Sequence, residues 1–306
     1  MNNKITSQRF KNFISYDFWK MVIAIVAVII VVGLTMRITT PSPTYAQEFT
    51  LMVDSAIITG DEGRNLLNDV DGRDVSNYGF SYDILRTKSY YLTTGQHSPS
   101  FLMHTYKKAY QDDAFICADA DENSLYKSYV SNFYGVELTS YVDQAISFAN
   151  EFYAQNGQLD EQKVKDYFAS KRGKDVRFIS DTDYFNAVNN ECLRITAIKE
   201  NATKLKQIFS TYDILYKYEQ LESFGEIVEE GYYAIDFSKL NVYKRQDKNL
   251  MNAFSRIRDL GDGNYESTLE NVLLLVGNNY EASNDLHYEG LAVINTIIKT
   301  YTTLLD

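Results

Sequence analysis

The chain has 306 residues, of which 45% are hydrophobic and 23% charged, with 41 acidic side chains against 30 basic ones. This composition excludes a disordered tail, a collagen-like repeat and a small disulfide-rich scaffold. Because only Cys117 and Cys192 are present, the cysteines alone cannot form a zinc cluster.

The first predicted element is a membrane-spanning helix. Residues 21–36 contain no charge, and Phe18 extends the apolar stretch upstream of Lys20, whose long side chain can extend to lipid headgroups. A helix over residues 18–38 would be roughly 30 Å long, the thickness of the hydrocarbon core of a bilayer. We therefore expect one transmembrane helix at 18–38.

The charges on either side of this segment predict its orientation. Residues 1–46 hold five basic side chains and one acidic one, whereas the rest of the chain holds 25 basic and 40 acidic side chains. The positive-inside rule predicts a cytoplasmic basic arm at 1–17, a short stalk at 39–46 and an extracytoplasmic domain at 47–306. A domain this acidic repels nucleic acid, so we expect no nucleic-acid partner.

Two fates of the apolar segment remain open, namely a retained signal-anchor and a cleaved signal peptide. The small Ala46, with Thr44 two positions before it, would suit cleavage. The long, aromatic-rich arm and the length of the apolar stretch favour a retained anchor. A lipoprotein is excluded because no cysteine lies near the end of this stretch.

The first part of the extracytoplasmic domain predicts strands and helices in alternation. The expected elements, in order, are a strand at 47–59, a helix at 62–68, a strand at 80–92, a helix at 98–111 and a strand at 113–118. The succession of strand, helix and strand from residue 80 onward predicts a βαβ unit with a partly parallel sheet.

The remainder is predicted to be mostly helical. Helices are expected at 140–154, 160–170, 247–260 and 284–305, with a strand at 232–237 and a strand or short core helix at 269–276. The apolar spacing over 182–222 predicts either one long helix or two helices that break near Asn201. The fold class is therefore α/β or α+β, helix-rich, with a mixed sheet.

One acidic segment resembles part of a calcium loop. Asp119, Asp121 and Asn123 occupy positions 1, 3 and 5 of an EF-hand-like pattern, but Ser124 and Val130 stand where glycine and glutamate are required. The pattern favours Asp121 as a helix cap over a calcium site.

Other motifs give no specific signal for catalysis. His97 and His104 lie seven residues apart, but a zinc site needs a third ligand and His287 is far downstream. Ser124 and Lys127 form an SxxK match without the companion motifs of penicillin-recognising enzymes. We therefore predict no catalytic, cofactor-binding or metal-binding residues, no cofactor and no enzymatic activity.

Tyrosine is the one residue type in excess, with 25 residues. Tyrosines suit contacts with carbohydrate, peptide or protein, but their helical spacing here favours a role in the core. Cys117 is expected in a strand and Cys192 on a helix, and two separate buried thiols are favoured over a disulfide.

The segment Ser98–Asp119, a helix followed by an acidic turn and an apolar strand ending in Asp, resembles a step in extracytoplasmic solute-binding proteins. The closing helix at 284–305 is also similar to that family. Membrane-anchored relatives in Gram-positive bacteria likewise begin with a basic, aromatic arm and a single span. The resemblance implies a bilobal, type 2 periplasmic-binding fold and assigns no ligand-binding residue to this chain.

Two functions follow as hypotheses. The first is a bacterial, single-pass, membrane-anchored binding protein, whose partners are the lipid bilayer and a small solute held without chemical change. The alternative is a cell-envelope protein that binds another protein through the helical region 182–222. Concentration-dependent association would favour the alternative.

Overall fold

The structure is a computed structural model. It describes residues 7–12, 18–39, 48–70, 86–91, 112–119, 125–131, 135–171, 173–174, 178, 180–219, 221–223, 226–228, 230–277, 288 and 290–306. The chain divides into an N-terminal unit, which contains helices α1 and α2, and a larger unit that contains the other described elements.

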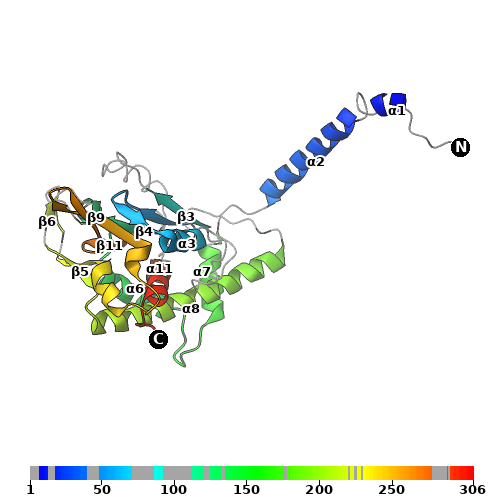
Figure 1. Ribbon diagram of the computed structural model, residues 1–306. Coiled ribbons are helices and arrows are strands. Elements are labelled where there is room, and N and C mark those ends of the chain that lie inside the picture. Colours follow the sequence, from blue (N-terminus) through cyan, green and yellow to red (C-terminus); the bar gives the residue numbers. More distant parts are fainter. Residues whose placement is uncertain are drawn as a thin grey trace. The chain divides into compact units, whose positions relative to one another are not determined.

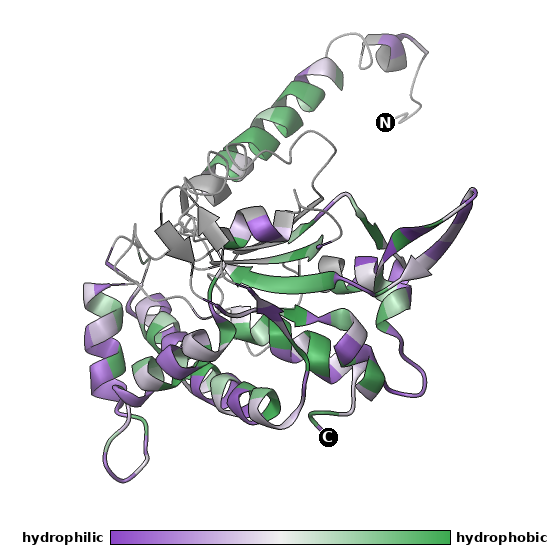
Figure 2. Cartoon of the chain, turned by 90° about the vertical axis from the view of Figure 1, so that its left-hand side faces the viewer, coloured by the Kyte–Doolittle hydropathy of each residue, from purple (hydrophilic) through white to green (hydrophobic). Residues whose placement is uncertain are grey.

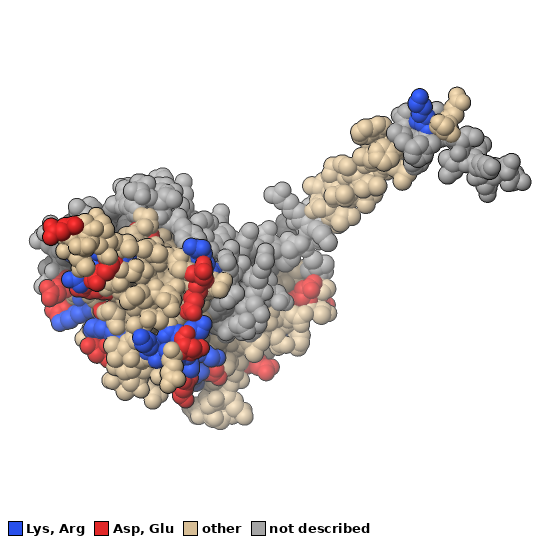
Figure 3. Space-filling model, viewed as in Figure 1, with Lys and Arg blue, Asp and Glu red and all other residues tan. Residues whose placement is uncertain are grey.

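The N-terminal unit consists of a short helix α1 (Ser7–Asn12) and the apolar helix α2 (Phe18–Thr39). With 22 residues, α2 is roughly 33 Å long. None of its segment Phe18–Thr35 is buried, and α2 is the one helix in the described ranges that is long and apolar enough to cross a membrane. Its surface is a nearly continuous uncharged rod in Figure 3. The predicted apolar helix is confirmed.

The larger unit is built on a six-stranded mixed sheet (Figure 1). Its strands, in spatial order, are β3 (Arg86–Tyr91), β1 (Glu48–Val53), β4 (Asp112–Ala118), β11 (Val272–Gly277), β8 (Gly231–Asp236) and β5 (Leu215–Tyr218). The first three strands are parallel, and each later strand is antiparallel to its neighbour. The predicted class of mixed helix and sheet is confirmed.

The connections place β1 at the centre of the parallel part. The chain leaves β1 through β2 (Ile57–Thr59) and α3 (Asp61–Val70) to β3 on one side, and β4 then lies on the other side of β1. The strands expected at 80–92 and 113–118 are therefore parallel but separated by β1. The helix expected at 98–111 lies outside the described residues.

Both faces of the sheet are covered. One face packs against α6 (Leu138–Asn150), α8 (Asp181–Thr211) and α11 (Gly290–Tyr301), while α7 (Glu161–Ser170) packs on α8. The opposite face carries a smaller core with α5 (Leu125–Ser131). Buried side chains alternate between these cores along β4 and β11, as in Ile116 and Cys117 of β4. Figure 2 shows the mainly apolar strands of the sheet next to a layer of helices.

Side-chain caps determine where the central helices begin. The carboxylate of Glu137 accepts the N–H of Ser140 at the start of α6, and Asp160 accepts that of Lys163 in α7. Ser180 caps α8 by accepting the N–H of Asp183. The predicted helices 140–154 and 160–170 are confirmed, although α6 ends at Asn150.

The prediction of helix through residue 222 was wrong beyond Thr211. Tyr212 is extended, and β5 follows, then the hairpin of β6 (Leu221–Ser223) and β7 (Glu226–Val228). The alternative break near Asn201 does not occur, because α8 is one continuous helix. The amide oxygen of Asn201 instead accepts a hydrogen bond from Asn295 of α11.

The helix predicted at 247–260 was also wrong. Only α10 (Leu250–Ala253) is helical, and β9 (Phe254–Gly261) then forms a hairpin with β10 (Asn264–Thr268) and pairs with β2. Gly261, Asp262 and Gly263 have φ values of 85°, 53° and 79°, the left-handed conformation that a tight turn with glycines accommodates. Because this turn reverses the chain, residues 254–268 form two antiparallel strands in place of the predicted helix.

Two further strand predictions are refined. The strand expected at 47–59 is split into β1 and β2, because the Asp54 carboxylate accepts the N–H of Ala56 in a turn between them. The segment expected at 269–276 as a strand or a short helix is the strand β11. The strand at 232–237 corresponds to β8, which is followed by α9 (Phe237–Leu240) and a 3-10 turn at Asn241–Tyr243.

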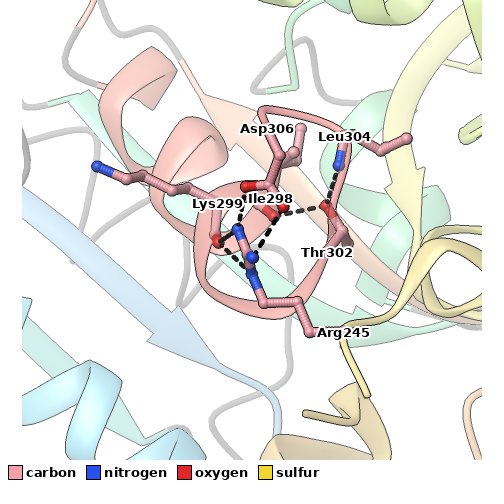
Figure 4. Close-up of polar contacts among 6 residues, drawn as sticks. All are labelled: Arg245, Ile298, Lys299, Thr302, Leu304 and Asp306. Carbon is pink, nitrogen blue, oxygen red and sulfur yellow. Dashed lines mark hydrogen bonds and ion pairs between the residues drawn. The ribbon is translucent and has the colours of Figure 1, made fainter. Parts of the chain in front are cut away.

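The last residues are held by one arginine (Figure 4). The Arg245 guanidinium donates two hydrogen bonds to the Asp306 carboxylate, at 2.9 and 2.6 Å, and two to the carbonyl oxygen of Lys299. Lys299 lies in the last turn of α11, where carbonyl groups have no partner within the helix. Arg245 therefore caps this helix and fixes the C-terminal segment to the preceding chain.

Candidate functional site

Two aspartates end neighbouring parallel strands. Asp54 follows β1 and Asp119 follows β4, and the N–H of Asp54 bonds to the carbonyl oxygen of Ile116 at 2.8 Å. The strand order reverses here, because β3 follows β1 on one side and β4 lies on the other. In open α/β sheets, ligands bind outside the carboxyl ends of strands at such a reversal. This edge is therefore the candidate site.

The carboxylates share one face of the sheet. Cys117 is in register with Leu273, which is in register with Asp236, and continuation of the β1–β4 register brings Asp54 beside Cys117. Asp119 lies two residues beyond Cys117, hence on the same face. Burial, followed by the charges of Asp54 and Asp119, raises the pKa of the Cys117 thiol. The three aspartates thus lie on one face at one edge of the sheet, with Asp236 three strands away from Asp54.

Asp236 has a structural role within this group. Its carboxylate accepts the N–H and the hydroxyl of Ser238, at 2.8 and 2.6 Å, and so caps α9. Asp54 likewise accepts a hydrogen bond from the N–H of Ala56, at 3.1 Å.

Asp119 has a tyrosine and a lysine beside its carboxylate. The Tyr216 hydroxyl donates to Oδ2 of Asp119 at 2.8 Å, and Nζ of Lys127, on α5, lies 3.8 Å from Oδ1. The Asp119 side chain is only 7% exposed. A buried carboxylate with a phenolic donor on one oxygen and a more distant ammonium near the other is a polar centre within an apolar face.

Two neighbouring tyrosine hydroxyls are buried without a partner. The Tyr126 ring makes edge-to-face contacts with Tyr216 and Tyr218, at centroid distances of 5.4 and 5.6 Å. The side chains of Tyr126 and Tyr218 are 1% and 3% exposed. Neither hydroxyl has a hydrogen-bond partner among the residues that the structure describes. Each such group costs about 1–3 kcal/mol of stability.

The pKa values of these tyrosines reflect the same surroundings. Burial is the largest cause in each case, and the nearby Asp119 charge adds to it. Together they raise the pKa of Tyr218 to about 12 and raise those of Tyr126 and Tyr216 further. All three hydroxyls are therefore protonated at neutral pH; that of Tyr216 donates to Asp119, and those of Tyr126 and Tyr218 can still donate. We call Asp54, Asp119, Tyr126, Tyr216 and Tyr218 the strand-end site.

The chemistry of this site suits binding. Burial and two carboxylates keep the Cys117 thiol protonated, and a protonated thiol is a poor nucleophile. Within the described ranges, no group of three or more His, Cys, Asp or Glu side chains could hold a metal ion. The site combines carboxylate acceptors with hydroxyl groups that can both donate and accept.

The sequence motifs contribute little to this site. Of the calcium-like pattern, Asp119 belongs to the site, whereas Val130 is buried on α5, where it cannot coordinate an ion. Lys127 of the SxxK match lies near Asp119. The other members of these motifs lie outside the described residues, namely His97, His104, Asp121, Asn123, Ser124 and His287.

The cysteines and most of the tyrosines that were singled out have structural positions. Cys117 is buried in β4, Cys192 is half-buried on α8, and both are free thiols. Many tyrosines fill the core, as Tyr141 and Tyr288 do through a ring contact at 5.3 Å. Sequence reasoning missed Asp54, although an aspartate directly after a buried strand is a usable signal.

A second surface feature lies on α6 and α8. A pocket of about 200 Å³ is lined by Thr139, Val142, Asp143, Lys206, Phe209 and Ser210. Its two charged groups, Asp143 and Lys206, form an exposed ion pair with each other at 2.7 Å. Elsewhere on α8, Phe185 and Leu193 are 63% and 50% exposed.

Comparison of the chain with models of known protein families, with curated proteins and with solved structures gives no match.

Proposed function

We propose that this protein is a membrane-anchored extracytoplasmic binding protein that holds a small solute at the strand-end site without changing it chemically. The helix α2 would span the bilayer as a retained signal-anchor, with the basic arm in the cytoplasm. The observation that carries the binding role is the buried Asp119 carboxylate where the strand order reverses, bonded to Tyr216, whose ring packs on Tyr126 with its buried, unpartnered hydroxyl.

The energetics of the site support this role. Folding places two polar hydroxyls in an apolar face without hydrogen bonds, which lowers the stability of the free protein. A ligand with matching groups would restore those hydrogen bonds on binding. Sites that sacrifice stability in this way are commonly functional.

The bilobal arrangement implied by the solute-binding resemblance belongs to this proposal as a refinement. In such a fold the ligand is enclosed between two lobes, and the strand-end site would form the wall contributed by the first. A single binding face would suffice for the proposed function.

The direct test is thermal unfolding of the full chain in lipid nanodiscs against a panel of sugars, amino acids, amines and peptides. A ligand at 100 times its dissociation constant adds about 2.7 kcal/mol to the free energy of unfolding. We expect a rise in Tm of roughly 5 °C with one chemical class.

A matched pair of variants locates the binding. Asp119→Asn should abolish the rise in Tm, whereas Asp143→Asn, which alters an exposed carboxylate on α6, should leave it intact. A panel that gives no shift, or a shift that survives Asp119→Asn, would contradict the proposed site.

The alternative, a protein-interaction role, has one observation in its favour. Phe185 and Leu193 lie eight residues apart on α8 and expose large apolar side chains. A partner protein could cover them. Sedimentation of the full chain at increasing concentration tests self-association, and the double variant Phe185→Ser/Leu193→Ser should abolish any association through this surface.

A further inference from the structure

We infer that Asn156 is a site of spontaneous covalent modification, at which the side-chain amide is lost and a mixture of aspartate and isoaspartate forms. The inference goes beyond the proposed function and does not depend on it. It stands on the single Asn-Gly pair in the sequence, Asn156 and Gly157, and on the turn in which the structure places that pair.

The pair lies at the tip of a chain reversal between α6 and α7. The N–H of Ala154 bonds to the carbonyl oxygen of Gln158 at 2.8 Å, and the N–H of Gly157 bonds to that of Ala154 at 2.9 Å. Residues 154–158 are all exposed. Water, which is a reactant in the loss of the amide, therefore reaches the Asn156 side chain.

Gly157 makes the reaction possible at this position. The attacking group is the main-chain nitrogen of the residue that follows the asparagine, and a side chain on that residue crowds the nitrogen. Gly157 has no Cβ, and its φ of 80° lies in the region that glycine adopts most readily. Every other asparagine in the sequence is followed by a residue with a side chain.

The hydrogen bonds of Asn156 prepare its amide for attack. Its Oδ1 accepts the N–H of Gln158 at 3.0 Å, and its Nδ2 donates to Oε1 of Gln158 at 3.1 Å. The first bond closes an Asx turn, which folds the side chain toward the main chain that follows it and so favours the ring closure. The same N–H stabilises the negative charge that develops on Oδ1 during attack.

The reaction proceeds in two steps. The nitrogen of Gly157 forms a bond to the side-chain carbonyl carbon of Asn156 and gives up its proton, the bond from that carbon to Nδ2 breaks, and ammonia leaves. Water then adds to either carbonyl of the cyclic imide and opens it to aspartate or isoaspartate. The hydrogen bond from Gly157 to Ala154 must open first, and at an exposed tip such opening costs little free energy.

The modification changes the charge and the main chain of the turn. Both products add a negative charge, and isoaspartate also lengthens the main chain by one carbon. The reversal is closed by an isolated bridge between Tyr153 and Leu159, and Asp160, which caps α7, follows directly. We therefore expect isoaspartate at this position to loosen the start of α7.

The experiment follows each asparagine in the full chain. The protein in lipid nanodiscs is kept at neutral pH for several weeks, and peptide mapping by mass spectrometry measures the fraction of each asparagine that has lost its amide. We expect Asn156 to react roughly tenfold or more faster than Asn264, an exposed asparagine of β10 that precedes Tyr265. Isoaspartate should form alongside aspartate, because direct hydrolysis of the amide gives aspartate alone. A rate no higher than that of Asn264, or a product without isoaspartate, would overturn the inference.

Three variants separate the dipeptide from the turn. Gly157→Ala, whose added Cβ would meet no atom within 4 Å, should slow the reaction roughly tenfold, and Asn156→Gln should abolish it because the larger ring closes far more slowly. Tyr265→Gly creates a second Asn-Gly pair at Asn264, where pairing of β10 with β9 restrains the main chain, and this pair should react more slowly than Asn156. An unchanged rate in Gly157→Ala would overturn the attack by Gly157. Equal rates at Asn156 and at the new pair would overturn the role of the turn.

Discussion

Single carboxylates in this protein join elements that are distant in the sequence. Glu137 accepts hydrogen bonds from the hydroxyl of Thr139 and the N–H of Ser140 at 2.6 and 2.7 Å, and from the N–H of Tyr232 at 3.1 Å. The first two bonds cap α6, and the third ties this cap to β8. One ionised side chain therefore fixes the start of α6 to strand β8.

This cap predicts a pH dependence. Burial alone would raise the pKa of Glu137, but the hydrogen bonds from Thr139, Ser140 and Tyr232 outweigh it, so the folded-state pKa is lowered. Because the folded pKa lies below the unfolded one, the stabilisation is present above the unfolded pKa of about 4.3 and is lost as the pH falls through the folded value. Glu137→Gln should lower the free energy of unfolding by about 1 kcal/mol at pH 7. It should also make that free energy depend less on pH below about pH 4.5, because the titrating carboxylate is gone.

Chemical denaturation at a series of pH values measures this effect. Glu200→Gln, at an exposed position of α8, is the control and should keep the slope of the wild-type protein. An unchanged slope in Glu137→Gln would contradict the assignment.

The buried tyrosines predict a second, alkaline transition. Burial and the charge of Asp119 raise the pKa of Tyr218 to about 12 and those of Tyr126 and Tyr216 above it. A raised folded-state pKa contributes stability that is complete below the unfolded value near 10 and is lost as the pH rises through the folded value. Tyrosinate absorbance should therefore show that exposed tyrosines ionise first. The three buried tyrosines should ionise only as the protein unfolds, which the loss of its circular dichroism signal reports.

The triple variant Tyr126→Phe/Tyr216→Phe/Tyr218→Phe should move the alkaline unfolding midpoint to higher pH. The exposed-site variant Tyr265→Phe should not move it. Coincident ionisation of all tyrosines near pH 10 in a protein that stays folded would be inconsistent with these buried sites.

At the scale of elements, the long helix α8 carries a charge pair into the core. Arg194 is 1% exposed, and its guanidinium donates to Glu191 at 2.8 Å, one turn earlier. Removal of one partner leaves a buried charge without its counter-ion, which typically costs about 3–5 kcal/mol. We therefore expect Arg194→Leu to lower the free energy of unfolding by about that amount.

The double variant Glu191→Leu/Arg194→Leu distinguishes the charge from the packing. Because it removes both charges and keeps apolar volume, it should recover most of the stability that Arg194→Leu loses. Urea denaturation of both variants provides the measurement. A double variant as unstable as the single one would show that packing around Arg194 matters more than the pair.

The same elements show what the sequence could predict. Apolar spacing and capping residues located α6, α7 and the start of α8, since one buried face recurs every three to four residues. Beyond Thr211 the spacing of Tyr212 and Tyr216 still fits a helix, yet the aromatic pattern of Leu215–Tyr218 also fits a strand, and pairing with β8 decides.

The strand-end site depends on contacts that no local pattern contains. Asp54 and Asp119 are 65 positions apart in the sequence and lie at the same edge of the sheet only because β1 and β4 pair in parallel. Tyr216 lies on β5, the outermost strand on the other side of the sheet, and its hydroxyl bonds to Asp119, 97 positions earlier in the sequence. The turn at Gly261–Gly263 was a local signal, but helical spacing before it obscured the strand β9.

At the scale of the whole molecule, the charge asymmetry predicts topology. Five basic side chains and one acidic one precede residue 47, and 40 acidic side chains follow. With α2 as a single span, the basic arm should stay in the cytoplasm and the acidic unit should lie outside. Protease added to intact cells should then digest a C-terminal tag and spare an N-terminal one, and the intact mass should include residues 1–46.

A charge exchange tests whether the flanking residues cause this topology. The test variant replaces Lys4, Arg9, Lys11 and Lys20 by Ser and introduces three lysines into the stalk at 39–46. Its orientation in the membrane should become inverted or mixed, because basic residues near a span resist translocation. Replacement of the four basic residues alone should give a partial effect, and three serines in the stalk should give none. Digestion of both tags equally in the parent protein would show instead that α2 does not span the membrane, and a product that begins near residue 47 would show that the segment is a cleaved signal.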